Sequence, residues 1–232
     1  MHPAEESLER EKKVVKWLDS ICGEASEIYL LGDIFDYWFE YKRVVPRGFT
    51  RFLGKIAEIS DAGVKVHFFT GNHDVWIFNY LPAELGVDVF RKPLVKEYNG
   101  KKFHIAHGDG LGPGQRGYKF LKRIFTSRLL QWLYARLHPN FATAFALGWS
   151  KRSRFAKGVS TEFLGEDNEY LIRYSKDILK KEHFDYFIFG HRHLPLEYDL
   201  PGGSKMVYLG DWIEHFTYAV WDGQTLELKH HQ

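Results

Sequence analysis

Hydrophobic positions alternate between two spacings along the first part of the chain. Residues 5–21 carry apolar side chains at helical spacing among charges, and a short apolar run follows at 27–31. The same pair returns as a helical pattern at 48–62, closed by Gly63, and an apolar run at 64–69. Alternation of helices with buried strands predicts an α/β fold.

The second part of the chain predicts a hairpin, a helix and several more strands. Asn99 and Gly100 form a hairpin-turn signal between strands at 94–98 and 102–106. Residues 166–181 place acids first and lysines last, as the helix dipole favours. A strand is expected at 185–189, and a β-rich tail at 205–209, 216–221 and 225–229. No repeat or linker interrupts the pattern, which predicts one domain over 1–232.

Composition places the chain among ordinary globular proteins. It has 232 residues, of which 44% are hydrophobic and 27% charged, and this excludes a disordered or low-complexity chain. The lone Cys22 cannot form an internal disulfide and is typical of a reducing cytosol. Residues 1–11 are too charged for a signal peptide, and no apolar run reaches the length of about 18 residues of a membrane span. We therefore expect a cytoplasmic protein.

Basic residues are concentrated in one segment, although the net charge is only +2. Residues 110–161 contain no Asp or Glu. Such a block attracts phosphates, nucleic acid or an anionic membrane surface, and the alternative is a solvated helix face. Its ten cationic residues are Arg116, Lys119, Lys122, Arg123, Arg128, Arg136, Lys151, Arg152, Arg154 and Lys157.

Four of the predicted strands end in small clusters of metal-type ligands. In α/β sheets, ligands bind outside the carboxyl ends of the strands, so these clusters are expected to converge. Glycine beside each ligand allows a sharp turn and a close backbone approach. The clusters are Gly32-Asp33-Ile34-Phe35-Asp36, Gly71-Asn72-His73-Asp74, His107-Gly108-Asp109 and Gly190-His191-Arg192-His193.

The chemistry of these clusters favours an open catalytic metal centre. Carboxylate, carboxamide and imidazole together suit a divalent first-row metal, and the absence of thiolates argues against a structural zinc site. The ligand types suit Mn, Fe, Zn, Ni or Co better than Ca or Mg. Each cluster alone is equally typical of a turn or a helix cap, but four in this order predict metal binding.

The ordered clusters resemble the motif set of the calcineurin-like metallophosphoesterases. The resemblance implies a four-layer α/β/β/α sandwich with a two-metal centre at the strand ends. Asp33 would bridge the two metals, and Asn72, His107 and His191 would complete one metal site. His193 would belong to the other site.

The same resemblance assigns catalytic roles and exposes a gap. His73 would act as an acid or electrostatic stabiliser beside the leaving group, oriented by Asp74. The family begins with an Asp-x-His strand that ligates the metal shared by His193, whereas this sequence begins with a helical pattern. His2 lies before that helix and is a poor substitute, because it has no apolar strand to hold it. We expect that strand to be absent and one metal at most to be well occupied. Either an upstream segment lies outside this sequence, or the protein is a weakly active or non-catalytic relative.

Three further stretches resemble one branch of the family, which hydrolyses the pyrophosphate of UDP-2,3-diacylglucosamine to UMP and a lipid monophosphate in lipid A synthesis. They are 32–38, 107–111 with the basic segment after it, and 208–220. His73 departs from the best-known members, which have Arg there. The implied partners are a lipid-linked nucleotide sugar and the anionic inner membrane surface. A soluble nucleotide or protein phosphatase and a non-catalytic scaffold remain alternatives.

The basic segment itself predicts a helical cap insert at about 111–160. Residues 118–137 interleave large apolar residues with cations, and 141–149 are almost all apolar. The apolar faces could form an acyl groove or could pack on the core, and amphipathicity does not separate the two. No nucleic-acid motif accompanies the cations, so no nucleic-acid partner is expected. The candidate substrate-binding residues are Asp36, Asp109, Arg116, Lys122, Arg152, Arg154 and Arg192.

Overall fold

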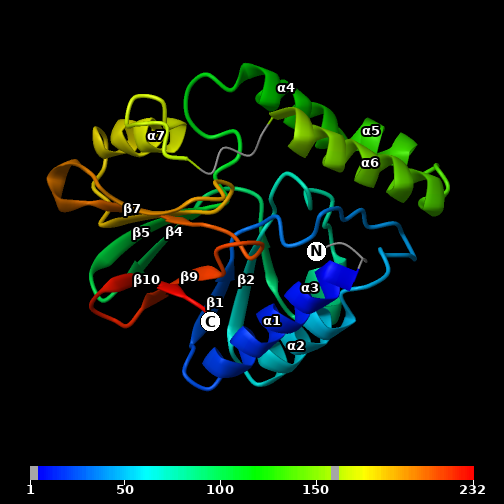
Figure 1. The fold of residues 1–232 in the computed structure, drawn as a ribbon, viewed down its shortest axis with the longest axis horizontal. Coiled ribbons are helices and arrows are strands. Elements are labelled where there is room, and N and C mark those ends of the chain that lie inside the picture. The colour runs from blue at the N-terminus through cyan, green and yellow to red at the C-terminus, as the bar shows by residue number, and fades with distance from the viewer. Residues whose placement is uncertain (1–4, 158–161) are drawn as a thin grey trace. The chain divides into compact units, whose positions relative to one another are not determined.

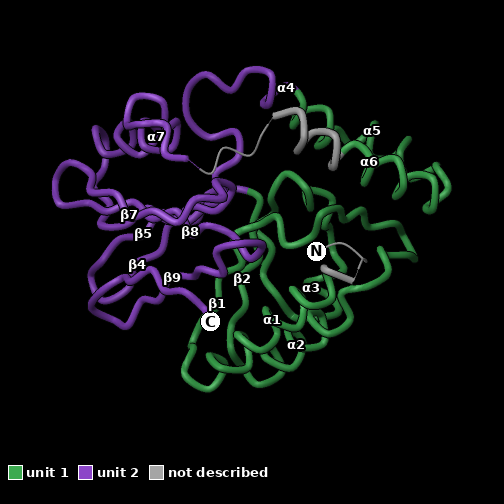
Figure 2. Tube along the Cα trace, viewed as in Figure 1, with its two compact units in different colours: residues 1–91, 121–158 green, residues 92–120, 159–232 purple. Residues whose placement is uncertain are grey.

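The computed structural model describes residues 5–157 and 162–232, with side chains at 7–149 and 162–232. The chain divides into two compact units (Figure 2). Unit 1 comprises residues 1–91 and 121–158, and unit 2 comprises residues 92–120 and 159–232. Helices and strands alternate as predicted, so the mixed α/β class is confirmed (Figure 1). The single domain with a cap insert stays a prediction.

Unit 1 is built on a parallel sheet of order β1-β2-β3. The strands β1 and β2 were predicted within a residue of their ends, whereas β3 and α3 were missed because they are too short for a periodic signal. The strands are β1 (Glu27–Leu30), β2 (Lys65–Phe69) and β3 (Asp88–Phe90), and the helices beside them are α1 (Glu5–Ile21), α2 (Thr50–Asp61) and α3 (Tyr80–Leu85).

A carboxylate from α1 caps the start of α2. The residue before α2, Phe49, provides no side-chain cap. Instead the buried Glu11 accepts hydrogen bonds from the backbone N–H groups of Arg51 and Phe52, at 2.9 and 3.1 Å. Negative charge at a helix N-terminus is favourable because the first N–H groups have no partner within the helix.

The basic insert forms three helices, as predicted: α4 (Arg116–Phe125), α5 (Arg128–Tyr134) and α6 (Pro139–Lys157). Aromatic contacts attach residues 125–142 of the insert to the rest of unit 1. The indole of Trp76 stacks on Tyr134 at 5.7 Å, and its N–H donates to the carbonyl oxygen of Phe125 at 2.8 Å. The hydroxyl of Tyr134 lies 3.1 Å from that of Tyr37 and donates to the carbonyl oxygen of Ala142 in α6. Trp76 and Tyr134 therefore anchor the insert.

Unit 2 contains a five-stranded sheet of order β4-β5-β6-β8-β7, and β5, β6 and β8 run parallel to one another. The predicted hairpin is confirmed, with positive φ at both Asn99 and Gly100, the backbone that a tight hairpin turn requires. The other two strands of unit 2, β9 and β10, form a separate antiparallel hairpin. The strands of unit 2 are β4 (Leu94–Tyr98), β5 (Lys101–Ala106), β6 (Tyr186–Phe189), β7 (Pro195–Asp199), β8 (Lys205–Leu209), β9 (Thr217–Trp221) and β10 (Leu226–His230).

The remaining helix, α7 (Tyr170–Leu179), packs its buried Leu171 and Ile172 on the core of unit 2. The helix prediction at 166–181 was wrong at its start, because Glu166 bonds Lys176 and Tyr198 and lies before the helix. The strand β7 and the short 3₁₀ turn Pro201–Gly203 were missed. Proline opens β7, which is tolerated because β7 lies at the sheet edge.

Within the described part of the chain, no helix is both long enough and apolar enough to cross a bilayer.

A buried histidine makes the stability of unit 2 depend on pH. His104 in β5 is 4% exposed, and its ring lies 5.6 and 5.4 Å from the rings of Phe184 and Phe187. Its Nε2 lies 3.2 Å from the hydroxyl of Tyr174. Burial lowers the pKa of His104 to about 4 from its usual 6.5. The folded protein therefore keeps this ring neutral at a pH at which the unfolded chain protonates it.

We expect the free energy of unfolding to decrease as the pH falls from 6.5 toward 4. The unfolded chain gains a proton there that the folded state does not bind, which costs about 1.4 kcal/mol per pH unit and about 3 kcal/mol in all. Urea unfolding at several pH values should show a weaker dependence for His104→Gln than for the wild type. His183→Gln, at an exposed ring in the same unit, should keep the wild-type dependence. An identical pH dependence in His104→Gln would contradict this.

Candidate metal centre

In unit 1, two of the predicted clusters leave the same edge of the sheet. The strands β1 and β2 are adjacent and parallel, with Leu30 beside Phe68. Asp33 follows β1 by three residues, and Asn72 follows β2 by three residues. The parallel arrangement therefore gathers both loops at the carboxyl ends of the strands, as expected.

Hydrogen bonds join these two loops. Asp74 is fully buried, and its carboxylate accepts the N–H groups of Ile34 at 2.9 Å and Gly71 at 2.6 Å. In the opposite direction, the Asp33 carboxylate accepts the N–H of His73 at 2.8 Å. Asp74 therefore bonds the backbone of both loops, and its expected role of orienting His73 stays a prediction.

Gly71 is required by the close approach of Asp33. A Cβ at Gly71 would lie 2.1 Å from a carboxylate oxygen of Asp33 and 2.6 Å from its backbone nitrogen. Asp33 itself has a φ of 55°, which is uncommon for a residue with a side chain. Strained backbone of this kind concentrates at functional sites, where the surrounding contacts maintain it.

The side-chain oxygen of Asn72 is a buried acceptor that lacks a donor among the described residues. A buried polar atom without a partner is costly, at about 1–3 kcal/mol, so a cation would satisfy it. This observation fits the ligand role expected of Asn72.

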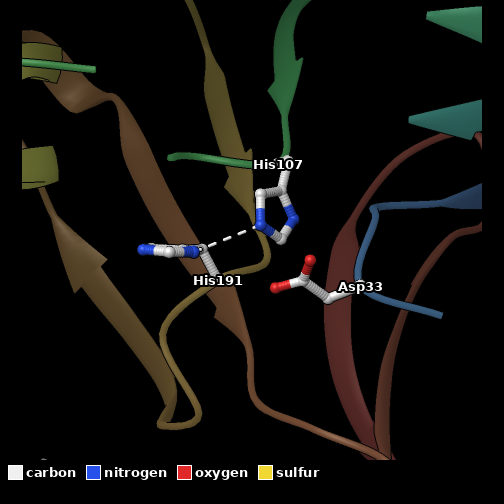
Figure 3. A group of neighbouring side chains, drawn as sticks. All are labelled: Asp33, His107 and His191. Carbon is white, nitrogen blue, oxygen red and sulfur yellow. Dashed lines mark hydrogen bonds between the residues drawn. The ribbon is translucent and has the colours of Figure 1, made fainter. Parts of the chain in front are cut away.

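In unit 2, the parallel strands β5, β6 and β8 bring a second group of side chains to one sheet edge. His107 follows β5, and its Nε2 lies 3.2 Å from Nδ1 of His191, which follows β6 (Figure 3). His107 is 4% exposed, and His191 has a φ of 58°. Two imidazole nitrogens this close can share a proton or turn their lone pairs toward one metal ion.

His193 has a partner that the sequence reasoning did not include. Its Nδ1 lies 3.2 Å from Oδ2 of Asp211, in the loop after β8. Burial alone would raise the pKa of Asp211, but hydrogen bonds from His193 and from three backbone N–H groups hold it well below its usual range. The signal was present, because Gly210-Asp211 follows a predicted strand just as Gly32-Asp33 does.

Arg192, a candidate phosphate clamp, is paired inside unit 2. Its guanidinium donates to the carboxylate of Glu169 at 2.9 Å and to the carbonyl oxygen of Glu162 at 3.0 Å. Glu169 is 1% exposed and also accepts the hydroxyl of Tyr208 at 3.1 Å. This pair, between a half-buried arginine and a buried carboxylate, fixes the loop after β6.

The other candidate substrate-binding residues lie in different surroundings. Asp109 is buried and accepts the hydroxyl of Tyr118 at 2.5 Å, while Asp36 is half-buried in the loop after β1. In α4, Arg116 is exposed and Lys122 is half-buried. Arg152 and Arg154 belong to α6, but their side chains lie outside the described residues.

Ligand atoms for a metal ion are offered by Asp33 in unit 1 and by His107 and His191 in unit 2 (Figure 3). With Asn72, these residues supply carboxylate, carboxamide and imidazole donors and no thiolate. This set, together with the unsatisfied oxygen of Asn72, fits a divalent first-row metal.

Candidate metal ligands after the carboxyl ends of parallel strands fit a metal-dependent enzyme, and comparison with known families agrees. The family model described as Calcineurin-like phosphoesterase matches residues 1–195. The chain therefore belongs to the calcineurin-like phosphoesterase family.

Three similar proteins carry one name, "UDP-2,3-diacylglucosamine hydrolase". The protein of Porphyromonas gingivalis is 44% identical over 232 residues, which cover 94% of this chain and 88% of the relative. That of Neisseria meningitidis is 29% identical over 220 residues, covering 94% and 89%. That of Photorhabdus laumondii is 28% identical over 193 residues, covering 82% and 78%.

We expect Gly71→Ala to weaken metal binding about tenfold or more, because its Cβ would displace the Asp33 carboxylate and backbone. Overpacking should also lower the free energy of unfolding by about 1–3 kcal/mol. Calorimetric titration of the metal-stripped protein with Mn²⁺, together with urea unfolding, measures both effects.

Gly54→Ala is the matched control. Gly54 lies in the exposed middle of α2, and a Cβ there meets nothing within 4 Å. This variant should bind metal normally and gain about 0.5–1 kcal/mol in stability, since alanine favours the helix. Unchanged metal affinity in Gly71→Ala would contradict the proposed position of Asp33.

Proposed function

We propose that the protein hydrolyses the pyrophosphate bond of UDP-2,3-diacylglucosamine, releasing UMP and the lipid monophosphate, in lipid A synthesis. The observation that carries this proposal is the 44% identity to the Porphyromonas gingivalis hydrolase, which extends over 94% of this chain and 88% of that protein. The ligands at the strand ends support the same chemistry, because pyrophosphate hydrolysis requires charge neutralisation at the phosphoryl oxygens.

The proposed metal is a divalent first-row ion, with Mn the first candidate. Asp33, Asn72, His107 and His191 would hold one ion, and Asp33 and His193 would contribute to a second site. Unit 1 supplies the carboxylate and carboxamide, and unit 2 supplies the imidazoles. Family membership and the complementary donor types support combining them in one centre.

When bound, the metal supplies positive charge that neutralises phosphoryl oxygens and lowers the pKa of the attacking water. His73 would donate a proton, or a hydrogen bond, to the oxygen of the leaving lipid phosphate. Asp74 would hold the His73 loop through its bonds to Ile34 and Gly71. The protein thereby fixes the donors before the substrate arrives.

Binding of the phosphates falls to the cations of the insert. Since Arg192 is committed to Glu169 and Asp109 to Tyr118, we assign them the positioning of their loops. Arg116 and Lys122, with Arg152 and Arg154, are the proposed contacts for the phosphates or for anionic headgroups. Asp36 remains a proposed contact for the nucleotide-sugar moiety.

The helices of the insert expose an unusual amount of apolar surface. On α6, Phe141, Phe145 and Trp149 are 62, 57 and 55% exposed, and their neighbouring rings lie 6.5 and 6.4 Å apart. On α5, Trp132 and Leu133 are also exposed. Contiguous exposed apolar side chains mark interaction surfaces. With the surrounding cations, they suit acyl chains and the anionic inner membrane, to which we propose the protein binds peripherally.

One observation favours a soluble phosphatase instead. The sequence Gly71-Asn72-His73-Asp74 is the general form of the phosphoesterase motif, whereas the best-known diacylglucosamine hydrolases have Arg at the position of His73. Such an enzyme would hydrolyse small phosphoesters and would be indifferent to acyl chains.

Asp33→Asn tests the proposed centre. Loss of the bridging charge should reduce UMP release from UDP-2,3-diacylglucosamine in detergent micelles with Mn²⁺ by about a thousandfold, because metal charge stabilisation is worth several kcal/mol. Asp61→Asn, at the exposed end of α2, should retain full activity. Wild-type protein that cleaves small phosphoesters but releases no UMP would overturn the substrate proposal.

The triple variant Phe141→Ser, Phe145→Ser and Trp149→Ser tests the apolar surface of α6. Binding to vesicles that contain phosphatidylglycerol should weaken by about tenfold or more, since three large side chains lose membrane burial. Charge reversal at Arg152 and Arg154 should act in the same direction.

Hydrolysis of a small chromogenic phosphodiester should remain unchanged in the triple variant. Val95→Ser, at a residue 48% exposed on β4, should leave vesicle binding unchanged. Equal vesicle binding by the triple variant and the wild type would rule out a membrane-binding role for this surface.

A further inference from the structure

We propose that Asp211 is a positioning residue that holds the imidazole of His193 in the tautomer a metal ligand requires. The inference rests on the proposed function, in which His193 contributes to the second metal site. It adds to that site a residue outside the four clusters that the sequence predicted.

One ring nitrogen of His193, Nδ1, faces the carboxylate of Asp211. This nitrogen lies 3.2 Å from Oδ2 of Asp211. An imidazole binds a metal through its unprotonated nitrogen, and its other nitrogen carries the proton and needs an acceptor. An ionised carboxylate can accept hydrogen bonds but cannot donate one. Asp211 therefore favours the proton on Nδ1 and leaves the lone pair of Nε2 for the metal.

The backbone holds the Asp211 carboxylate in place. Its other oxygen, Oδ1, accepts the N–H groups of Ile213, Glu214 and His215 at 2.9, 2.8 and 3.1 Å. The side chain is 8% exposed, compared with 31% for His193. Because each oxygen has its own partners, the carboxylate cannot rotate away from His193 without losing backbone hydrogen bonds.

The sheet places the two residues side by side. The strands β6 and β8 are parallel neighbours, with Phe189 beside Tyr208, so the loops after them leave the same edge. Gly210 makes the turn into Asp211 with a φ of 73°. A Cβ at Gly210 would lie 2.4 Å from the hydroxyl oxygen of Thr217, so this turn depends on glycine.

A purely structural role, the capping of the turn after β8, is the competing explanation. Unit 2 contains a residue that has this role alone. Asp222 accepts the N–H groups of Gln224 and Thr225 through Oδ1, at 2.8 and 2.7 Å, and its other oxygen bonds the Thr225 hydroxyl. Asp222→Asn is therefore a matched control for Asp211→Asn.

The first test reads the tautomer of His193 in the metal-free protein by nitrogen NMR at pH 8. The wild type and Asp222→Asn should carry the proton on Nδ1. In Asp211→Asn, the amide NH₂ faces Nδ1 as a donor, so the proton should move to Nε2. The same tautomer in all three proteins would overturn the inference. This measurement does not depend on which substrate the protein hydrolyses.

The second test measures Zn²⁺ affinity by calorimetry. Loss of such a supporting carboxylate costs about 10- to 100-fold in metal affinity, so we expect this loss in Asp211→Asn and none in Asp222→Asn. In a His193→Ala background, Asp211→Asn should cause no further loss. An equal loss with and without His193 would show that Asp211 acts through the fold and would overturn the inference.

Discussion

The buried carboxylate of Asp74 is the interaction on which the candidate site in unit 1 depends. It belongs to the loop after β2 and accepts the backbone N–H groups of Gly71 in that loop and of Ile34 in the loop after β1. Without it, these donors would be buried and unsatisfied, at a cost of about 1–3 kcal/mol each. The orientation of Asp33 and Asn72 thus follows from one acceptor that is fully buried. The Asp74 side chain therefore has a structural role that is separate from any catalytic one.

Local sequence patterns were sufficient for the elements that carry the site. Apolar runs followed by glycine and a ligand residue correctly placed Asp33, Asn72, His107 and His191 after β1, β2, β5 and β6. These signals are short-range, because a buried strand and the turn after it are encoded within about ten residues. The β8 loop with Asp211 obeys the same rule, although Asp211 was not among the four predicted clusters.

Long-range pairing could not be predicted in this way. Arg192 reads as a free cation in the sequence, yet it is bound to Glu169, 23 residues away. The start of α2 is capped by Glu11, 40 residues before Arg51. Such partners are set by tertiary packing, which hydrophobic periodicity does not encode. Arg192 therefore stabilises unit 2 through its pair with Glu169.

Because the insert is attached through Trp76, a substitution at Trp76 and a substitution on the exposed faces of α5 and α6 have different structural effects. The indole stacks on Tyr134 and donates to the backbone of Phe125, so it recognises one ring and one carbonyl oxygen. The outward-facing positions of α5 and α6 take no part in this contact. These positions can change while the contact stays the same, whereas a change at Trp76 alters the contact itself, two residues from Asp74. The exposed apolar surface of α5 and α6 can therefore change without altering the loop that carries the proposed ligands.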